Sequence, residues 1–172
     1  MASDTHLDNT ISIAAHKALG FDVEAPTVRF RKWLTTTSGE KAGAKPQPLT
    51  LVPLDGTFAI CRLAADAPIP TWATTGPFVS ITRTADELSV VCRQEAVPEG
   101  VQCERDWRCL RVAGTLAFSL VGVLASMLTP LAETGVSVFV ASTFDTDYLL
   151  VKERDVQQAE EVLRRAGHTV CH

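Results

Sequence analysis

The sequence predicts an α+β fold in which antiparallel β-sheets carry helices on one face. Three observations lead to this prediction. Short runs rich in β-forming residues follow one another at close spacing after residue 50. In the C-terminal half, two helical stretches alternate with such runs. A hairpin pattern at residues 78–93 is repeated at residues 138–153, which indicates two related units or, alternatively, two hairpins that share the same local chemistry.

The sequence predicts mainly strands in the first half of the region after residue 50. Residues 57–63 alternate between apolar and polar positions and predict a strand. Residues 78–93 predict two further strands joined by a tight polar turn. The stretch 68–74 contains Pro70 and has room for two helical turns at most. A helix-poor first unit is therefore expected.

The second half has a regular order of elements. The expected elements are a strand at 108–112, a helix at 119–134, strands at 136–143 and 148–152, a helix at 155–166 and a short strand at 168–171. Ser119 and Asp155 are the expected N-caps, and Gly135 and Gly167 follow the two helices. This βαββαβ order is typical of ferredoxin-like units, with a four-stranded antiparallel sheet and both helices on one face.

The repeat suggests how the chain is divided. Each copy is an apolar strand, a turn with an acid at the same position of the alignment (Glu87 and Asp147), and a second apolar strand. We expect an N-terminal arm and linker at 1–49, a first unit at 50–105 and a second unit at 106–172.

Composition and charge exclude several kinds of partner. The formal net charge of -4 and the absence of a Lys/Arg cluster argue against nucleic acid and against a membrane surface as partners. Residues 112–132 carry no charge and match a membrane span in length. Polar and small residues dilute this run, however, and its apolar positions from Leu120 to Leu131 fall on one helical face. We therefore expect a buried helix.

Cysteine and histidine usage gives no sign of metal or redox chemistry. The five cysteines include no CxxC pair, which predicts reduced thiols, and Cys61, Cys92 and Cys109 lie in apolar runs typical of a core. His168 and His172 with Cys171 lack a fourth ligand for zinc. The start of the chain has no signal-peptide pattern. We expect a cytoplasmic protein with no metal, no cofactor and no catalytic residues.

The N-terminal segment differs from the rest in composition. Residues 7–19 predict a short helix, and residues 35–48 predict a polar linker. Residues 27–34 are compatible with a strand and equally with an exposed peptide that docks onto a partner. A protein partner bound through this arm therefore remains one hypothesis.

Four stretches resemble a known family. Residues 87–92, 112–125, 130–135 and 142–151 resemble bacterial tandem ACT proteins, which are related to the CASTOR arginine sensors and to the regulatory domains of aspartate kinase. The resemblance covers about residues 50–172. It implies two ACT units side by side, a small ligand (usually an amino acid) at the seam between units, and a tendency to form homodimers.

The residues themselves suggest where a ligand binds. The loop 114–119 leads into the expected helix, whose first N–H groups would lie near residues 119–122 and could receive a carboxylate. Gly122 allows either close approach of a ligand or tight helix–sheet packing. The candidate ligand-binding residues are Thr115, Phe118, Ser119, Leu120, Val121, Gly122, Ser142, Thr143, Phe144 and Asp147.

Asp147 has two interpretations. By resemblance, it matches an acidic position that holds the cationic part of the ligand in the arginine sensors. Alternatively, it is a turn aspartate that stabilises a hairpin. Where those sensors carry acidic residues, this chain has Ser119 and Leu120, so a strongly cationic side chain would find fewer partners.

Three functions from different classes are consistent with these residues. The first is an amino-acid-binding regulatory or sensor protein that acts in trans on another protein. The alternative is a ligand-free structural or interaction protein that uses the same scaffold to bind a partner. A small enzyme on a ferredoxin-like scaffold is the third, because a fold alone does not determine function.

Overall fold

The computed structural model describes residues 4–5, 28–29 and 47–171, and the chain divides into two units at residues 43–44. In the N-terminal unit, β1 (Asp4–Thr5) pairs antiparallel with β2 (Val28–Arg29). The helix expected at 7–19 and most of the linker expected at 35–48 lie outside the described residues.

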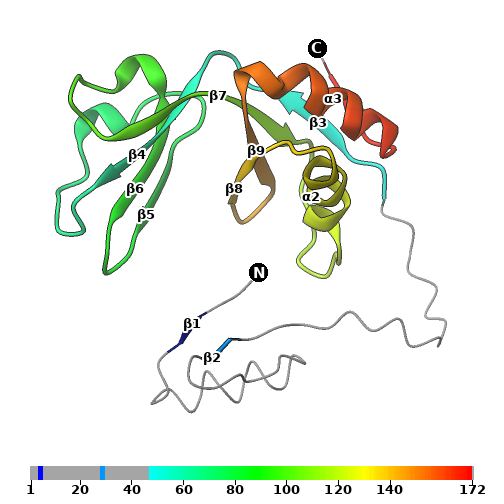
Figure 1. Cartoon of the computed structure of the whole chain (residues 1–172), viewed down its shortest axis with the longest axis horizontal. Coiled ribbons are helices and arrows are strands. Elements are labelled where there is room, and N and C mark those ends of the chain that lie inside the picture. The colour runs from blue at the N-terminus through cyan, green and yellow to red at the C-terminus, as the bar shows by residue number, and fades with distance from the viewer. Residues whose placement is uncertain (1–3, 6–27, 30–46, 172) are drawn as a thin grey trace. The chain divides into compact units, whose positions relative to one another are not determined.

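The first βαββαβ unit is almost entirely strand (Figure 1). Its elements are β4 (Phe58–Leu63), η1 (Thr71–Ala73), β5 (Ser80–Arg83), β6 (Leu88–Arg93), η2 (Gln94–Ala96) and the first half of β7 (Cys103–Val112). The strand order is β7-β4-β6-β5, as in a ferredoxin-like sheet. Single 3-10 turns stand in the two helix positions, and both connecting segments contain proline, which disfavours a helix interior.

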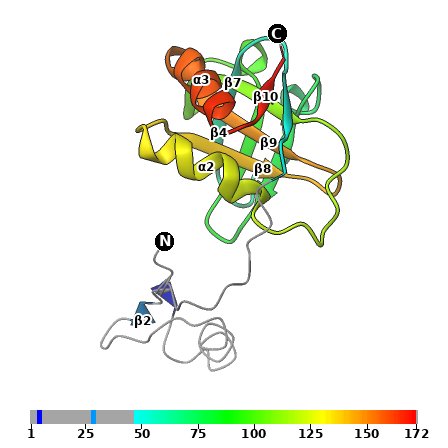
Figure 2. The same cartoon turned by 90° about the vertical axis from the view of Figure 1, so that its right-hand side faces the viewer.

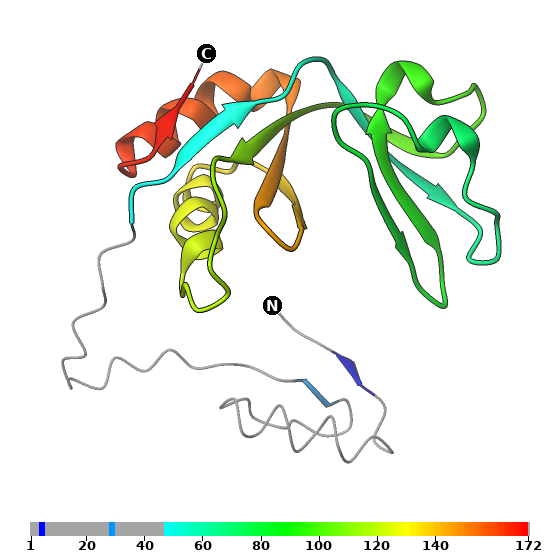
Figure 3. The same ribbon diagram turned by 180° about the vertical axis from the view of Figure 1, so that it is seen from behind.

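The second unit carries the two α-helices. Its elements are the second half of β7, α2 (Val123–Glu133), β8 (Val138–Ser142), β9 (Asp147–Lys152), η3 (Glu153–Asp155), α3 (Val156–Arg165) and β10 (Thr169–Val170). One strand was not expected in this sheet. β3 (Thr50–Pro53) lies between β10 and β7, parallel to the former and antiparallel to the latter (Figure 3). The first residues of the predicted first unit (50–105), which form β3, thus complete the sheet of the second unit.

A single long strand joins the two units into one eight-stranded sheet. β3 and β4 follow one another along the same edge of β7, with Leu51 opposite Val112 and Phe58 opposite Trp107. The other edge of β7 pairs with β9 from residue 107 onward. The loop that follows Val112 therefore leaves a strand that is paired on both edges, with β3 and with β9.

Buried side chains pack against both faces of the second unit's strands. Figure 2 shows α2 and α3 side by side over one face. Met127 and Leu131 of α2 and Leu163 of α3 are fully buried there. The opposite face packs against the first unit, where the rings of Phe78 and Tyr148 stack with centroids 4.3 Å apart. The mixed α+β fold with helices on one face agrees with the prediction.

The predicted start of the long helix was wrong. α2 begins at Val123 rather than Ser119, because Gly122 adopts φ 81°, a left-handed conformation that no helix interior accepts. Ser119 instead lies in a turn, in which the Leu120 N–H donates to the Ala117 carbonyl at 2.9 Å. The uncharged run 112–132 divides into strand end, loop and helix. Among the described residues, no helix is long and apolar enough to cross a membrane.

The two hairpins have equivalent turns, but their structural alignment differs by one residue from the alignment predicted from the sequence. In the first hairpin, the Thr84 N–H donates to the Glu87 carbonyl at 2.9 Å. In the second, the Thr143 N–H donates to the Thr146 carbonyl at the same distance. Glu87 therefore corresponds to Thr146, and the structural equivalent of Asp147 is Leu88. The predicted alignment matched Glu87 with Asp147 and so did not show that the equivalent of Asp147 is a leucine.

Candidate functional site

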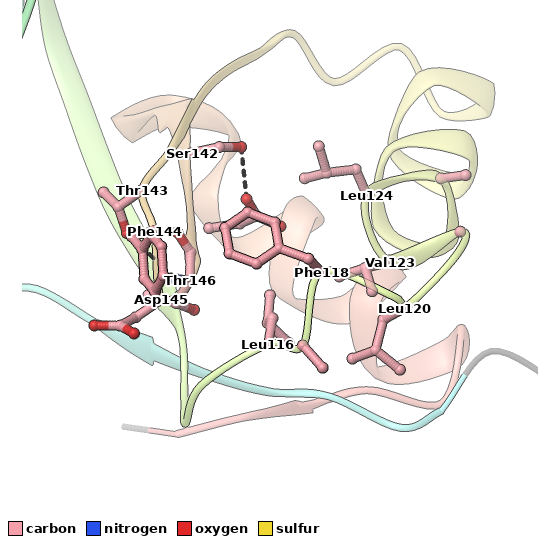
Figure 4. A pocket seen from close by; sticks show the side chains of 14 residues that line it. Leu116, Phe118, Leu120, Val123, Leu124, Ser142, Thr143, Phe144, Asp145 and Thr146 are labelled. Atoms are coloured by element: carbon pink, nitrogen blue, oxygen red, sulfur yellow. Dashed lines mark hydrogen bonds between the residues drawn. The ribbon is translucent and has the colours of Figure 1, made fainter.

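A cleft of about 450 Å³ lies between the start of α2 and the tip of the β8–β9 hairpin (Figure 4). The loop that follows β7 forms its floor and one rim. The lining residues are Leu116, Ala117, Phe118, Leu120, Gly122, Val123, Leu124, Ala125, Ser142, Thr143, Phe144, Asp145, Thr146 and Asp147. All of them belong to the second unit, so this cleft does not lie at the seam between the two units of one chain.

The structure brings most of the predicted site residues together. Those that line the cleft are Phe118, Leu120, Gly122, Ser142, Thr143, Phe144 and Asp147. Thr115 lines a neighbouring cavity of about 350 Å³ that shares part of the same loop. Ser119 and Val121 line neither cavity, and the side chain of Val121 is 96% exposed.

Sequence reasoning missed several lining residues. Leu116, Val123 and Leu124 were assigned only to apolar runs, and Asp145 and Thr146 only to a turn. The predicted helical spacing from Leu120 to Leu124 was not a valid signal for them, because Leu120 lies in the loop before α2. The corrected helix start places Val123 and Leu124 in the first turn, where they face the hairpin tip.

Asp147 is the most unusual group in the cleft. Its side chain is only 9% exposed, and Ser142 Oγ donates to Oδ1 at 2.6 Å, the dashed line in Figure 4. Within residues 47–171, no lysine, arginine or histidine forms an ion pair with it. Buried carboxylates are normally paired, because removing an unpaired charge from water costs several kcal/mol. The site therefore has room for a positive partner.

The loop and hairpin are tied together by backbone contacts. The Leu116 N–H donates to the Asp145 carbonyl at 2.7 Å. The buried Thr146 hydroxyl donates to the Val112 carbonyl, also at 2.7 Å. Thr143 Oγ1 accepts from the Thr146 N–H and so closes the hairpin turn. These contacts fix the cleft walls without using Asp147.

The start of α2 offers hydrogen-bond donors on the opposite wall. The N–H groups of the first helical turn, from Val123 to Ala125, have no acceptor within the helix, and the N-cap Gly122 has no side chain to cap them. The helix dipole adds partial positive charge at this end. A Cβ at Gly122 would meet no atom within 4 Å, so this glycine serves backbone conformation rather than close approach.

Two aromatic side chains stand at the mouth of the cleft. The rings of Phe118 and Phe144 pack edge to face, with centroids 5.0 Å apart and an interplanar angle of 75°. Each side chain is 78% exposed, which is unusual for phenylalanine. Ring faces attract cations, so the mouth suits a positively charged group as well as an apolar one.

The lining is acidic on balance. It contains Asp145, which is exposed, and Asp147, which is buried, and it includes no basic side chain. The only features of the lining that attract an anion are the α2 N–H groups. This arrangement suits a molecule that carries both an ammonium and a carboxylate group.

At the corresponding place in the first unit, an exposed arginine of the hairpin contacts the loop that follows the first strand. Arg83 stands at the hairpin position equivalent to Ser142. Its guanidinium donates to the Ala67 carbonyl at 2.7 Å and to the Ala65 carbonyl, both in the loop after β4. In the first unit, an arginine thus connects the hairpin to the loop after β4, whereas a cavity lies at the equivalent place in the second unit.

Of the histidines and the cysteine near the C-terminus, His168 and Cys171 are described and His172 lies outside the described residues. Both ring nitrogens of His168 face protein backbone: Nδ1 accepts from the Leu49 N–H at 3.3 Å, and Nε2 lies 3.2 Å from the Ser126 carbonyl. Among the described residues, no group of three His, Cys, Asp or Glu side chains could hold a metal ion.

The fold defines a tandem of βαββαβ units, and comparisons with known proteins agree with this class. A family model of the ACT domain matches residues 102–165, and a second model, of an N-terminal domain, matches residues 56–100. A crystallised Agrobacterium tumefaciens protein is 42% identical, with a TM-score of 0.70 over 72% of this chain and 92% of that one. The chain belongs to the ACT-domain family.

Two further relatives show the range of the similarity. The bovine cytosolic arginine sensor for mTORC1 subunit 1 is 30% identical over 99 residues, which are 51% of this chain and 30% of the sensor. This chain thus matches less than a third of that protein. A Vibrio cholerae protein of unknown function shares the fold, with 21% identity and a TM-score of 0.59 over 70% of this chain and 91% of that one.

Proposed function

We propose that this protein is a regulatory module that binds a free amino acid in the cleft of its second unit and acts in trans on another protein. The observation that carries the proposal is the buried carboxylate of Asp147, which lines a cavity and has no cationic partner among the described residues. An α-ammonium group would supply the missing charge. Its remaining hydrogen-bond donors could reach Ser142 and the carbonyls at the hairpin tip.

The carboxylate of the same ligand has a separate place. The free N–H groups at the start of α2 lie across the cleft from Asp147 and favour an anion. Sequence reasoning assigned this role to residues 119–122, and the observed helix start moves it to residues 123–125. The ligand side chain would then extend toward Phe118 and Phe144 at the mouth, which accept apolar or cationic groups.

Similarity to known proteins supports the same class of ligand. The bovine relative is named as an arginine sensor. This one matching segment supports an amino acid as the class of ligand and does not identify which amino acid binds. The proposal involves binding without catalysis and places the protein in the cytoplasm, with a second copy and a regulated protein as further partners.

An interaction role without ligand is the second candidate, and one observation favours it. Phe118, Leu120 and Phe144 are exposed apolar residues that line the cleft, and the exposed Val121 follows Leu120 in the same loop. Solvent-exposed clusters of large apolar side chains mark contact surfaces more often than chance. In this alternative, these side chains bind a protein and Asp147 only stabilises the hairpin through Ser142.

A thermal-shift screen of the full chain against the twenty amino acids separates the two candidates. A ligand that binds only the native state raises stability by RT ln(1 + [L]/Kd), so one amino acid at a hundred times its Kd adds about 2.7 kcal/mol. Calorimetry then gives its affinity. If no amino acid shifts the melting temperature at millimolar concentration, the ligand proposal is wrong and the interaction role gains support.

Asp147→Asn tests the charge at constant shape. The amide oxygen can still accept from Ser142, so the hairpin contact is kept while the charge is lost. A charge-assisted contact contributes about 1.5–3 kcal/mol, which corresponds to roughly a ten- to hundredfold loss of affinity. Asp86→Asn is the matched control, because Asp86 is an exposed turn residue of the first hairpin. Equal affinity of both variants would reduce Asp147 to a hairpin element.

A further inference from the structure

Three thiols of the first unit lie on one face of its sheet, in the cluster with Leu88 and Val90. Cys61 belongs to β4, Cys92 to β6 and Cys103 to the start of β7. Cys61 and Cys92 are buried, whereas Cys103 is partly exposed. Sequence reasoning treated the two buried thiols as core residues and gave Cys103 no role. The sheet register gives a reason to reconsider the set.

Cys61 and Cys103 stand directly opposite each other on antiparallel strands. The next pair is Arg62 with Gln102, and the Arg62 N–H donates to the Gln102 carbonyl at 2.9 Å. Hydrogen-bonded and non-hydrogen-bonded pairs alternate along an antiparallel ladder, so the cysteines occupy a non-hydrogen-bonded pair. Cα atoms in such pairs are about 4.5 Å apart, within the range of about 4.4–6.8 Å that a disulfide spans.

The other pairings do not have this geometry. Cys92 lies opposite Ala59, so it is a diagonal neighbour of Cys61, at a typical Cα separation of about 7–8 Å. β4 lies between Cys92 and Cys103, which separates these two by roughly two strand spacings, about 9–10 Å. Cys109 packs in a different cluster, and Cys171 follows β10 in the second unit.

We propose that Cys61 and Cys103 form a reversible cross-strand disulfide when the protein meets a small-molecule disulfide such as oxidised glutathione. The Cys103 thiolate attacks one sulfur of the small disulfide and releases one thiolate, which leaves a mixed disulfide at Cys103. The Cys61 thiolate then attacks Cys103 Sγ and releases the second small thiolate. Both cysteines lose their protons and are oxidised, and the small disulfide is reduced to two thiols.

The surroundings of the two thiols make this reaction slow at neutral pH. Burial, together with the neighbouring Cys61, raises the pKa of Cys103 above its usual value, although Arg105 opposes the shift. A hydrogen bond to Cys92, together with burial, raises the pKa of Cys61 further. Because only the thiolate attacks, the rate should rise roughly tenfold for each pH unit below the pKa of the attacking thiol.

Peptide mapping of the full chain without reductant tests the pairing. Trypsin cuts after Arg62, Arg83, Arg93 and Arg105, so Cys61, Cys92 and Cys103 fall in three different peptides. After incubation with oxidised glutathione at pH 7 and pH 9, we expect the Cys61 and Cys103 peptides to be linked. The link should form faster at pH 9 and disappear with dithiothreitol.

Single substitutions decide between the possible outcomes. Cys92→Ala should leave the link intact, and Cys103→Ala should abolish it while Cys61 stays reduced. Cys171→Ala is the matched control, because it removes a partly exposed thiol outside the proposed pair. A Cys61–Cys92 link would overturn the proposal. So would a Cys103 that remains a mixed disulfide, or remains unmodified, after prolonged incubation at pH 9.

Discussion

His168 joins three segments of the second unit, and its removal should be costly. The side chain is 5% exposed. Nδ1 accepts from the Leu49 N–H at 3.3 Å, which requires the neutral tautomer with its hydrogen on Nε2. Nε2 then donates to the Ser126 carbonyl of α2 at 3.2 Å. The imidazole thus connects the segment before β3 to the helix that borders the cleft.

The contact with Ser126 has a specific cause in the sequence. In an α-helix, the carbonyl of residue 126 accepts from the N–H of residue 130. Residue 130 is a proline inside α2 and has no N–H. His168 supplies the missing donor from outside the helix.

The expected loss of stability on replacing His168 comes from the two backbone groups that lose their hydrogen-bond partner. His168→Phe keeps an aromatic ring of similar shape and removes both hydrogen bonds. Two unpaired, partly buried backbone groups at about 1–3 kcal/mol each give a loss of about 2–6 kcal/mol in the free energy of unfolding. Urea unfolding followed by circular dichroism measures this loss, with an unchanged m-value as the sign that the native fold persists.

A double-mutant cycle isolates the link to the proline. Pro130→Ala restores an N–H within reach of the Ser126 carbonyl. The cost of His168→Phe should therefore be smaller in the Pro130→Ala background, by about 1–2 kcal/mol. Equal costs in both backgrounds would show that the histidine does not compensate for the proline, and the reasoning would fail.

Two further predictions concern the loop and the assembly. Gly122→Val should destabilise the fold by at least about 1–2 kcal/mol and shift the start of α2, because a β-branched residue resists a φ of 81°. Gly122→Asn should cost less, since asparagine tolerates that conformation, and equal unfolding energies for the two variants would contradict this account. We also expect a homodimer, because β5 and β8 each pair with only one strand among the described residues and the cleft mouth is apolar. Light scattering at micromolar concentration should give twice the chain mass of 18.6 kDa, and a value of one chain mass would contradict it.

Local pattern was sufficient to predict the strands and hairpins. β6 and β9 have the same order of buried and half-buried positions, and this periodicity can be read from the sequence. The second helix was also predicted closely, because Asp155 and Gly167 bracket it. These elements depend on neighbours within a few residues, which a single sequence displays directly.

Contacts between residues far apart in the sequence could not be predicted. The insertion of β3 between β10 and β7 depends on pairing between Leu51 and both Val112 and Val170, and nothing in the segment itself specifies those partners. The helix start was misplaced because Ser119 is a good N-cap residue by type, whereas the conformation of Gly122 decided the boundary. The bond between His168 and Ser126 spans 42 positions in the sequence and was likewise invisible.

Comparison of the two hairpins within this one chain gives an argument for the cleft that does not depend on relatives. In the first unit, Arg83 and Leu88 face each other at the end of the ladder; the leucine is fully buried and the arginine closes the loop. In the second unit, the same two positions hold Ser142 and Asp147. The serine shortens the side chain that would fill the cleft, and the aspartate introduces a charge where the other copy buries a hydrocarbon. An unpaired carboxylate at a core position is unfavourable in the absence of a positive partner, so the exchange of both residues together supports the proposal that a cationic group binds there.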